Sequence, residues 1–154
     1  MSGAVDRLAA LGLTLPPVTA PVAAYVPALR TGPYVYVSGQ LPVVGGKLPA
    51  VGKVGAEVSA EDAAAMARTC ALNALAAAAS VAGGLEAIRR IVKVTGFVAS
   101  APGFGGQPQV INGASELLIE VFGEEGKHAR SAVGVAELPL NAPVEVELIA
   151  EVRD

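Results

Sequence analysis

Two ionisable residues in the C-terminal part of this sequence are the strongest candidates for chemistry. Arg130 stands near the start of a predicted strand of small residues, and Glu145 near the start of the next predicted strand. A planar guanidinium that is always charged must find a carboxylate, supplied either by the protein or by a ligand. From the residue types alone, a structural salt bridge at Arg130 is favoured over a ligand clamp.

The other reactive side chains have simpler interpretations. His128 is the single histidine and could do acid–base chemistry, but its polar approach, Glu124-Glu-Gly-Lys-His128, favours a solvated loop residue. Cys70 is the single cysteine, which excludes an internal disulfide and a cysteine metal cluster. Its place among alanines in a predicted helix favours a small buried hydrophobe over a nucleophile. Asn73 in the same helix is predicted to make a local structural hydrogen bond.

The composition excludes several classes of protein. Hydrophobic residues make up 53% of the 154 residues and charged residues only 16%, which excludes intrinsic disorder. The net charge of -3, the thin scatter of 11 basic residues and the 4% of aromatic residues argue against a nucleic-acid partner. The sequence has no Walker lysine motif, no zinc-protease helix pair and no Gly-x-Ser-x-Gly elbow.

Two apolar stretches resemble membrane or targeting segments. Residues 8–26 are broken by prolines and lack a basic leader, which argues against a signal peptide. Residues 69–85 are mainly alanine, which favours a buried helix of a soluble protein over a membrane span. We therefore expect no membrane partner and a cytoplasmic location.

The elements that must position these side chains follow from hydrophobic periodicity. Strands are predicted at residues 25–29, 34–38, 88–100, 129–138 and 144–152, and helices at residues 5–11, 59–81 and 108–122. Ser59 and Asp62 form a capping box, with Asp in place of Glu, that begins the long helix. Two main helices on one face of a mixed or mainly antiparallel sheet is the economical α+β arrangement. We predict a single domain over residues 1–154, with an N-terminal helix and a Pro-rich arm at residues 1–22.

The last predicted strand shows how the sheet should be covered. Its alternate residues from Val144 to Val152 are apolar and should meet the helices, whereas the other face mixes three acids with Ile149. On the preceding strand, Arg130 shares one side with Ala132 and Gly134. A sheet face with small residues and few charges suits a subunit interface or the wall of a cleft, so we predict a homo-oligomer.

Several separate segments carry one family pattern. They are Val37-Ser-Gly-Gln-Leu-Pro42, Val92-Lys-Val-Thr-Gly-Phe-Val98, Ala129-Arg-Ser-Ala-Val133, Leu138-Pro139 and Val144-Glu-Val-Glu147, with Asn112 and Glu116 between them. In order and spacing, from about residue 25 to residue 152, the chain resembles the YjgF-type reactive intermediate deaminase (Rid) family. That family is also labelled endoribonuclease L-PSP or translation initiation inhibitor.

The resemblance implies a chorismate mutase-like fold and a homotrimer with clefts between neighbouring subunits, without a cofactor or a metal. The best characterised branch of the family hydrolyses reactive 2-imino and enamine acids, released by pyridoxal phosphate enzymes, to 2-keto acids and ammonia. Arg130 matches the arginine that binds the substrate carboxylate, and Glu145 the acid that orients or activates water. Tyr25 matches the tyrosine at the cleft, and Ser38 and Gly39 belong to its substrate-binding Ser-Gly-Gln segment.

The chain departs from the family pattern in several places. Ala132 stands where many members have Cys, Ala23 and Ala24 where Gly-Pro is usual, and Gly96 where a bulkier residue is usual. Residues 43–57 form a longer segment than in compact members. These departures affect substrate choice more than reaction type, because hydrolysis of an imine needs no covalent nucleophile.

Three functions follow from the sequence. The first is cofactor-free hydrolysis of imino and enamine acids. The second is a non-catalytic regulatory trimer that binds a small carboxylate, such as a 2-keto acid, in the same cleft. The third is an endoribonuclease or translation inhibitor, against which the acidic pI of about 5.2 argues.

Overall fold

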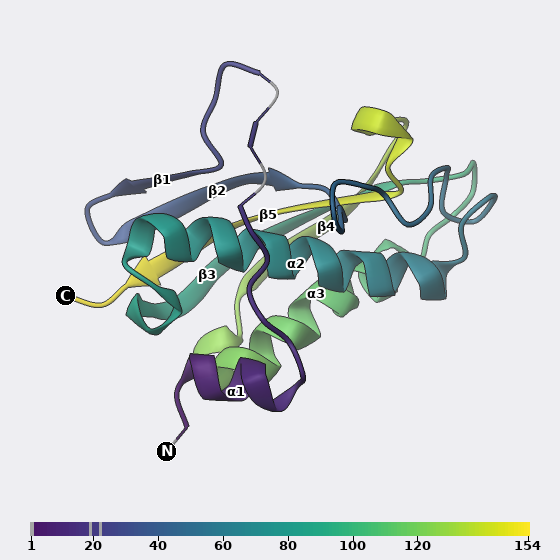
Figure 1. Cartoon of the computed structure of the whole chain (residues 1–154). Helices are drawn as coiled ribbons and strands as arrows, with labels where there is room; N and C mark the ends of the chain where they lie inside the picture. Colours follow the sequence, from purple (N-terminus) through teal and green to yellow (C-terminus); the bar gives the residue numbers. More distant parts are fainter. Residues whose placement is uncertain (1, 19, 22) are drawn as a thin grey trace.

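Alternating apolar residues build one five-stranded mixed sheet in the computed structural model, which describes residues 2–18, 20–21 and 23–154 (Figure 1). Its strands run in the order β1-β2-β5-β3-β4, with β3 and β4 parallel and the other pairs antiparallel. The strands are β1 (Ala28–Thr31), β2 (Tyr34–Gln40), β3 (Ile88–Ala99), β4 (Ala129–Val135) and β5 (Val144–Val152). The predicted α+β class is confirmed.

Two long helices, α2 (Ala60–Ala82) and α3 (Gln107–Phe122), lie on one face of this sheet (Figure 1). The hydroxyl of Ser59 accepts a hydrogen bond of 3.0 Å from the backbone N–H of Asp62, which confirms the predicted cap. Gly83, with φ 98°, ends α2 in the left-handed conformation that glycine tolerates best. A short helix, α1 (Ala4–Ala10), packs beside α3, and residues 1, 19 and 22 of the predicted N-terminal helix and arm lie outside the described residues.

The core lies between the helices and the sheet. The alternate residues of β5 from Val144 to Val152 are buried against the helices, as predicted. By length and composition α2 could cross a membrane, but more than half of its most apolar stretch is buried within the fold. Cys70 on this helix is completely buried, so its prediction as a small core residue is confirmed.

Three short 3-10 turns connect these elements: η1 (Leu85–Ala87), η2 (Gly123–Gly126) and η3 (Pro139–Asn141). The strand predicted at residues 25–29 begins only at Ala28, so Tyr25 lies in a loop. Pro27 has no N–H to donate to a neighbouring strand, and the carbonyl of Pro27 instead accepts the N–H of Ser38 at 2.9 Å. The strand predicted at residues 129–138 ends early, at Val135.

The parallel pairing of β3 with β4 decides which way Arg130 faces. Arg130 pairs with the buried Val94, and Ala132 pairs with Gly96, so this side of β4 faces α3. A Cβ at Gly96 would overlap the side chain of Ile111, which shows how closely α3 approaches the sheet here. Arg130 and the acids of β5 therefore lie on opposite faces of the sheet, contrary to the single face suggested by the sequence.

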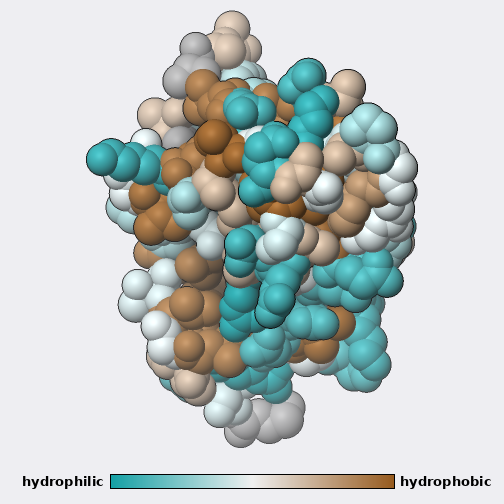
Figure 2. Space-filling view, turned by 90° about the vertical axis from the view of Figure 1, so that its right-hand side faces the viewer, coloured by the Kyte–Doolittle hydropathy of each residue, from teal (hydrophilic) through white to brown (hydrophobic). Residues whose placement is uncertain are grey.

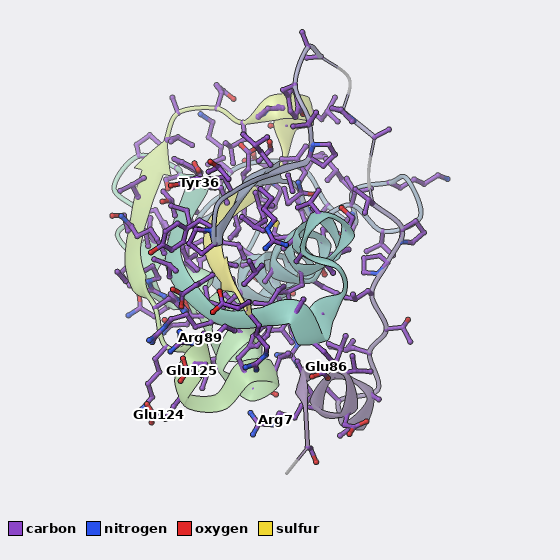
Figure 3. All side chains as sticks on the ribbon, turned by 90° about the vertical axis from the view of Figure 1, so that its left-hand side faces the viewer. Arg7, Tyr36, Glu86, Arg89, Glu124 and Glu125 are labelled. Atoms are coloured by element: carbon purple, nitrogen blue, oxygen red, sulfur yellow. The ribbon has the colours of Figure 1, made fainter. Side chains whose placement is uncertain are left out.

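The other face of the sheet is covered by no helix of the described residues and carries several large apolar side chains. Leu29 is 58% exposed, Tyr36 46% and Val133 43%, and Figure 3 shows Tyr36 on the side of the sheet away from α2. Arg89 and Glu125 lie at another corner of the same view. Figure 2, which views the molecule from the opposite side, shows hydrophobic residues interspersed with hydrophilic ones.

Candidate functional site

Arg130 is partly buried and is held against α3 by neutral groups. One terminal nitrogen, Nη1, donates to Asn112 Oδ1 at 2.8 Å and to Ser115 Oγ at 3.1 Å. The other, Nη2, donates to the carbonyl of Pro108 at 3.3 Å. All three acceptors belong to α3, so one rigid helix fixes the plane of the guanidinium. We call Arg130, these three partners and His128 the arginine cluster.

The charge of Arg130 is not neutralised within the described part of the chain. No carboxylate there forms an ion pair with it, so the predicted structural salt bridge is wrong. Both N–H groups of Nη1 and one of Nη2 are engaged, which leaves the Nε–H and one Nη2–H among the described contacts. The Nε–H and the Nη2–H on its side form one edge of a guanidinium, and that edge matches the two oxygens of a carboxylate.

His128 is a member of the arginine cluster and not the solvated loop residue that the sequence suggested. Its Nδ1 lies 2.6 Å from the carbonyl of Gly126, and its Nε2 lies 2.8 Å from Ser115 Oγ. Burial lowers the pKa of His128, and the charge of Arg130 lowers it further, although the hydrogen bond to Gly126 acts the other way. The polar residues before His128 in the sequence gave no sign of this contact.

Glu145 lies on the opposite face of the sheet, beside the end of β2. Its carboxylate packs so closely on Gly39 that a Cβ at that position would overlap it. Burial raises the pKa of Glu145 above its usual value, and the neighbouring charge of Glu147 raises it further. A carboxyl group with a raised pKa is suited to exchanging protons near neutral pH.

Tyr25 and Ser38 lie near Gly39, which the Glu145 carboxylate contacts, and they have different roles. The hydroxyl of Ser38 donates to the carbonyl of Val26 at 2.6 Å, so it fixes the loop that carries Tyr25. Tyr25 is 50% exposed and lines a pocket of about 130 Å³ together with Gly39 and Leu140. We call Glu145, Gly39, Ser38 and Tyr25 the glutamate cluster.

Asn73 supports this pocket from α2. Its Nδ2 donates to the carbonyls of Leu41 at 3.0 Å and Val43 at 3.1 Å, and both of these residues line the pocket. The bond predicted for Asn73 is therefore structural, but it spans about thirty residues of sequence rather than one helical turn. It anchors the start of the long segment 43–57.

The two clusters do not meet within one chain. Arg130 aligns through Val94 with Leu148 of β5, three residues beyond Glu145. Strand geometry therefore separates Arg130 and Glu145 by roughly 10 Å along the strands and roughly 10 Å across them, in addition to the opposite faces. One chain brings together Tyr25, Ser38, Gly39 and Glu145, but not Arg130.

Sequence reasoning did not identify Ser115. It is 7% exposed and lies four residues after the buried Ile111, within the apolar stripe of α3. A serine in such a stripe needs a hydrogen-bonding partner, and Asn112 lies three residues earlier on a neighbouring part of the surface of the helix. That spacing could have indicated a polar contact for α3.

The described residues contain no group of three or more His, Cys, Asp and Glu side chains arranged to hold a metal ion. Cys70 is remote from such chemistry, because burial raises the pKa of its thiol well above the usual value and Glu145 raises it further. Two side chains instead suit organic chemistry. The guanidinium of Arg130 can bind a carboxylate, and the partly buried carboxyl of Glu145 can exchange a proton.

The chain is similar to known proteins of one family. A family model described as "YjgF/chorismate mutase-like, putative endoribonuclease" matches residues 5–152. The chain is 44% identical over 149 residues to Protein TCP17 of Trypanosoma cruzi, covering 96% of this chain and 93% of that protein.

Two solved structures are informative neighbours. The protein Atu1372 from Agrobacterium tumefaciens, of unknown function, is 48% identical, with a TM-score of 0.89 over 97% of this chain and 92% of that one. TdcF from E. coli, solved with bound serine, is 28% identical, with a TM-score of 0.60 over 89% of this chain and 94% of that one.

Proposed function

Because the chain belongs to the YjgF/chorismate mutase-like family, we propose that it hydrolyses reactive 2-imino and enamine acids to 2-keto acids and ammonia without a cofactor. The observation that carries the proposal is the free edge of Arg130. A permanent cation that the described residues hold only by neutral groups, with two N–H donors left over, is suited to a small carboxylate. The serine bound to TdcF is a ligand of that chemical kind.

The proposed active site lies between neighbouring subunits of a homotrimer. Arg130 and Glu145 cannot act on one small substrate within a single chain, because they lie on opposite faces of the sheet. The exposed apolar residues Leu29, Tyr36 and Val133 on the uncovered face favour burial against another copy. In this arrangement the arginine cluster of one subunit faces the glutamate cluster of the next.

The chemistry requires positioning and one proton exchange. Arg130 would hold the substrate carboxylate by two charge-assisted hydrogen bonds and so fix the adjacent C=N carbon for attack. Glu145 would take a proton from the water as its oxygen bonds to that carbon, and would return this proton to the nitrogen as the C=N double bond becomes single. The resulting carbinolamine then loses ammonia: its hydroxyl proton passes to the nitrogen through Glu145 as the C–N bond breaks and the C=O bond forms.

The remaining residues of the glutamate cluster would form the wall of the site. Tyr25 offers a hydroxyl at the edge of the pocket, and Gly39 leaves room for the Glu145 carboxylate. Ser38 would act mainly by holding the Tyr25 loop, since its hydroxyl is bonded to Val26. We place this activity in the cytoplasm, where pyridoxal phosphate enzymes release such imines.

The test couples a pyridoxal phosphate dehydratase to the protein and follows decay of the released imine. We expect faster decay with the wild-type chain and no acceleration with Arg130→Ala, while Arg30→Ala, which removes an exposed arginine bonded to Gly32, keeps the activity. Light scattering should give a trimer for all three proteins. Full activity in a trimeric Arg130→Ala variant would refute the role of Arg130.

A second candidate function is a non-catalytic trimer that binds a small carboxylate. The bound serine of TdcF favours it, because binding of an amino acid does not require turnover. Calorimetry that detects a 2-keto acid on Arg130, with no turnover of any imine, would select this function over hydrolysis.

A further inference from the structure

A chain of hydrogen bonds behind Arg130 has no part in the proposed reaction. It runs from Arg130 Nη1 to Ser115 Oγ at 3.1 Å, then to His128 Nε2 at 2.8 Å. The other ring nitrogen, Nδ1, lies 2.6 Å from the carbonyl of Gly126 in η2. This series of hydrogen bonds therefore joins β4, α3 and the turn between them.

The direction of every bond in this chain follows from its last member. The Gly126 carbonyl can only accept, so Nδ1 of His128 carries a proton. In the neutral ring Nε2 then carries a lone pair, and the Ser115 hydroxyl must donate to it. The lone pairs of Ser115 Oγ are left for the N–H of Arg130.

Burial makes this arrangement stable. Ser115 is 7% exposed and would lose a hydrogen bond without His128, since it lies among the apolar residues of α3. Burial and the charge of Arg130 lower the pKa of His128, so the ring is neutral at pH 7. At pH 7 the neutral ring of His128 therefore accepts from Ser115, and Ser115 Oγ is a buried acceptor for Arg130.

We propose that Ser115 and His128 are positioning residues for Arg130, which hold its Nη1 against α3 so that the Nε–Nη2 edge faces the substrate carboxylate. The assignment of a carboxylate ligand rests on the proposed function, whereas the positioning of Arg130 does not. A guanidinium on a long side chain has many rotamers, and fixing it beforehand removes an entropic cost of binding. Asn112, the second acceptor of Nη1, holds the same nitrogen from the preceding turn of α3.

The first experiment measures positioning without any substrate. Because the sequence has a single histidine, one imidazole signal in nitrogen-15 NMR reports His128 directly, and the side-chain N–H signals of Arg130 report its rotation. We expect a neutral ring protonated on Nδ1 and slowly rotating Nη groups. Ser115→Ala and His128→Leu should average the Nη1 signals, while His128→Gln, whose amide oxygen can accept from Ser115, should keep them separate. Unchanged Arg130 signals in both Ser115→Ala and His128→Leu would overturn the inference.

The second experiment separates positioning from general stability. With an imino acid as substrate, Ser115→Ala should raise KM about tenfold, the loss expected for one hydrogen bond to a charged group, and leave kcat nearly unchanged. With the carboxamide of the same imine, which Arg130 cannot grip as an anion, the variant should behave as the wild type. The matched control is Ser80→Ala, because Ser80 donates only to its own helix at Ala77.

The outcomes distinguish the two proposals. An equal rise in KM for the imino acid and its carboxamide would show a merely structural defect and overturn positioning. A wild-type chain that neither turns over imines nor binds 2-keto acids would overturn the proposed function, and the NMR signals would then decide the positioning of Arg130 alone.

Discussion

The arginine and glutamate clusters are built in different ways. Arg130 takes its three acceptors, two side chains and one carbonyl, from one helix, and His128 adds a third side chain behind them. Glu145 instead lies against Gly39, and two residues that line the pocket with Gly39, Tyr25 and Leu140, belong to a loop and to the turn η3. The cationic half is therefore fixed on regular elements, and the acidic half combines one strand residue with adaptable loops.

This difference indicates which part of the proposed site recognises the substrate carboxylate and which part contacts the variable side chain. The group that recognises a feature common to all imino acids, the carboxylate, is the rigid one. The pocket beside Gly39, where the variable side chain of a substrate would lie in the proposed site, is lined by residues outside the helices and strands, among them Tyr25 and Leu41. Loops carried by a rigid scaffold are where specificity commonly changes.

The largest loss of activity is expected when Arg130, in the rigid arginine cluster, is substituted. Arg130→Lys keeps the positive charge but replaces the planar fork with a point charge, so kcat/KM should fall roughly 100-fold. Progress curves of imine decay measure this loss. Full activity of Arg130→Lys would contradict binding of the carboxylate by two hydrogen bonds and would leave only the positive charge at this position as the requirement.

In the acidic half, Glu145→Gln should also lower the rate, by roughly 10-fold to 100-fold, because the amide cannot take a proton. The same variant should be more stable above pH 7, by roughly 2 °C in Tm, since burial raises the pKa of Glu145 and its ionised form is unfavourable in the folded chain. Near pH 4 the carboxyl is largely protonated in both states, so the gain should disappear. Thermal unfolding at both pH values measures it.

A matched variant tests the same carboxyl by its pH profile. Glu147→Gln removes the second cause of the raised pKa of Glu145, so the acid limb of the rate profile should move to lower pH. An acid limb that stays in place would assign it to another group.

Gly39→Ala should lower activity about tenfold while the fold is retained. The added Cβ would overlap the Glu145 carboxylate and displace it from its present position. Gly105→Ala is the control, because a Cβ at that position meets no atom within 4 Å. Equal activities of the two variants would mean that the position of Glu145 is not critical.

The smallest effect concerns His128 and pH. Its pKa is lower in the folded chain than in the unfolded one, so the unfolded chain binds the proton first as pH falls below about 6.5. Stability should therefore fall with acid by up to about 1 kcal/mol, and His128→Gln should flatten this slope. Urea unfolding from pH 7 to pH 5 measures it. The positive charge of Arg130 opposes protonation of the ring, whereas Arg89 and Arg90, which line a pocket with His128, are paired with Glu151 and Glu125.

Local patterns in the sequence predicted most of the fold. The alternation in β5, the cap at Ser59 and the stop at Gly83 depend on residues close together in the chain. The face on which Arg130 lies depends on the pairing of β4 with β3 rather than β5, and periodicity carries no information about strand order.

The candidate site was predictable to a smaller extent. Family resemblance pointed to Arg130 and Glu145, and the chain does carry a free guanidinium edge and a partly buried acid. The contacts of Arg130 were not predicted, because Ser115, Asn112 and His128 become its neighbours only when α3 crosses back over the sheet. The sequence predicts a strand from Tyr25, whereas β1 begins only at Ala28, after Pro27, which has no N–H to donate to a neighbouring strand.

The buried thiol of Cys70 offers a way to time the opening of the molecule. A thiol-specific dye reacts only with an accessible thiolate, and this side chain has neither exposure nor a favourable pKa in the closed state. The dye therefore reacts with Cys70 only when α2 has separated from the sheet, and the rate of labelling measures how often this happens. The labelling rate, compared between ligand-free and ligand-bound protein, converts occupancy of the proposed cleft into a free energy of protection against opening.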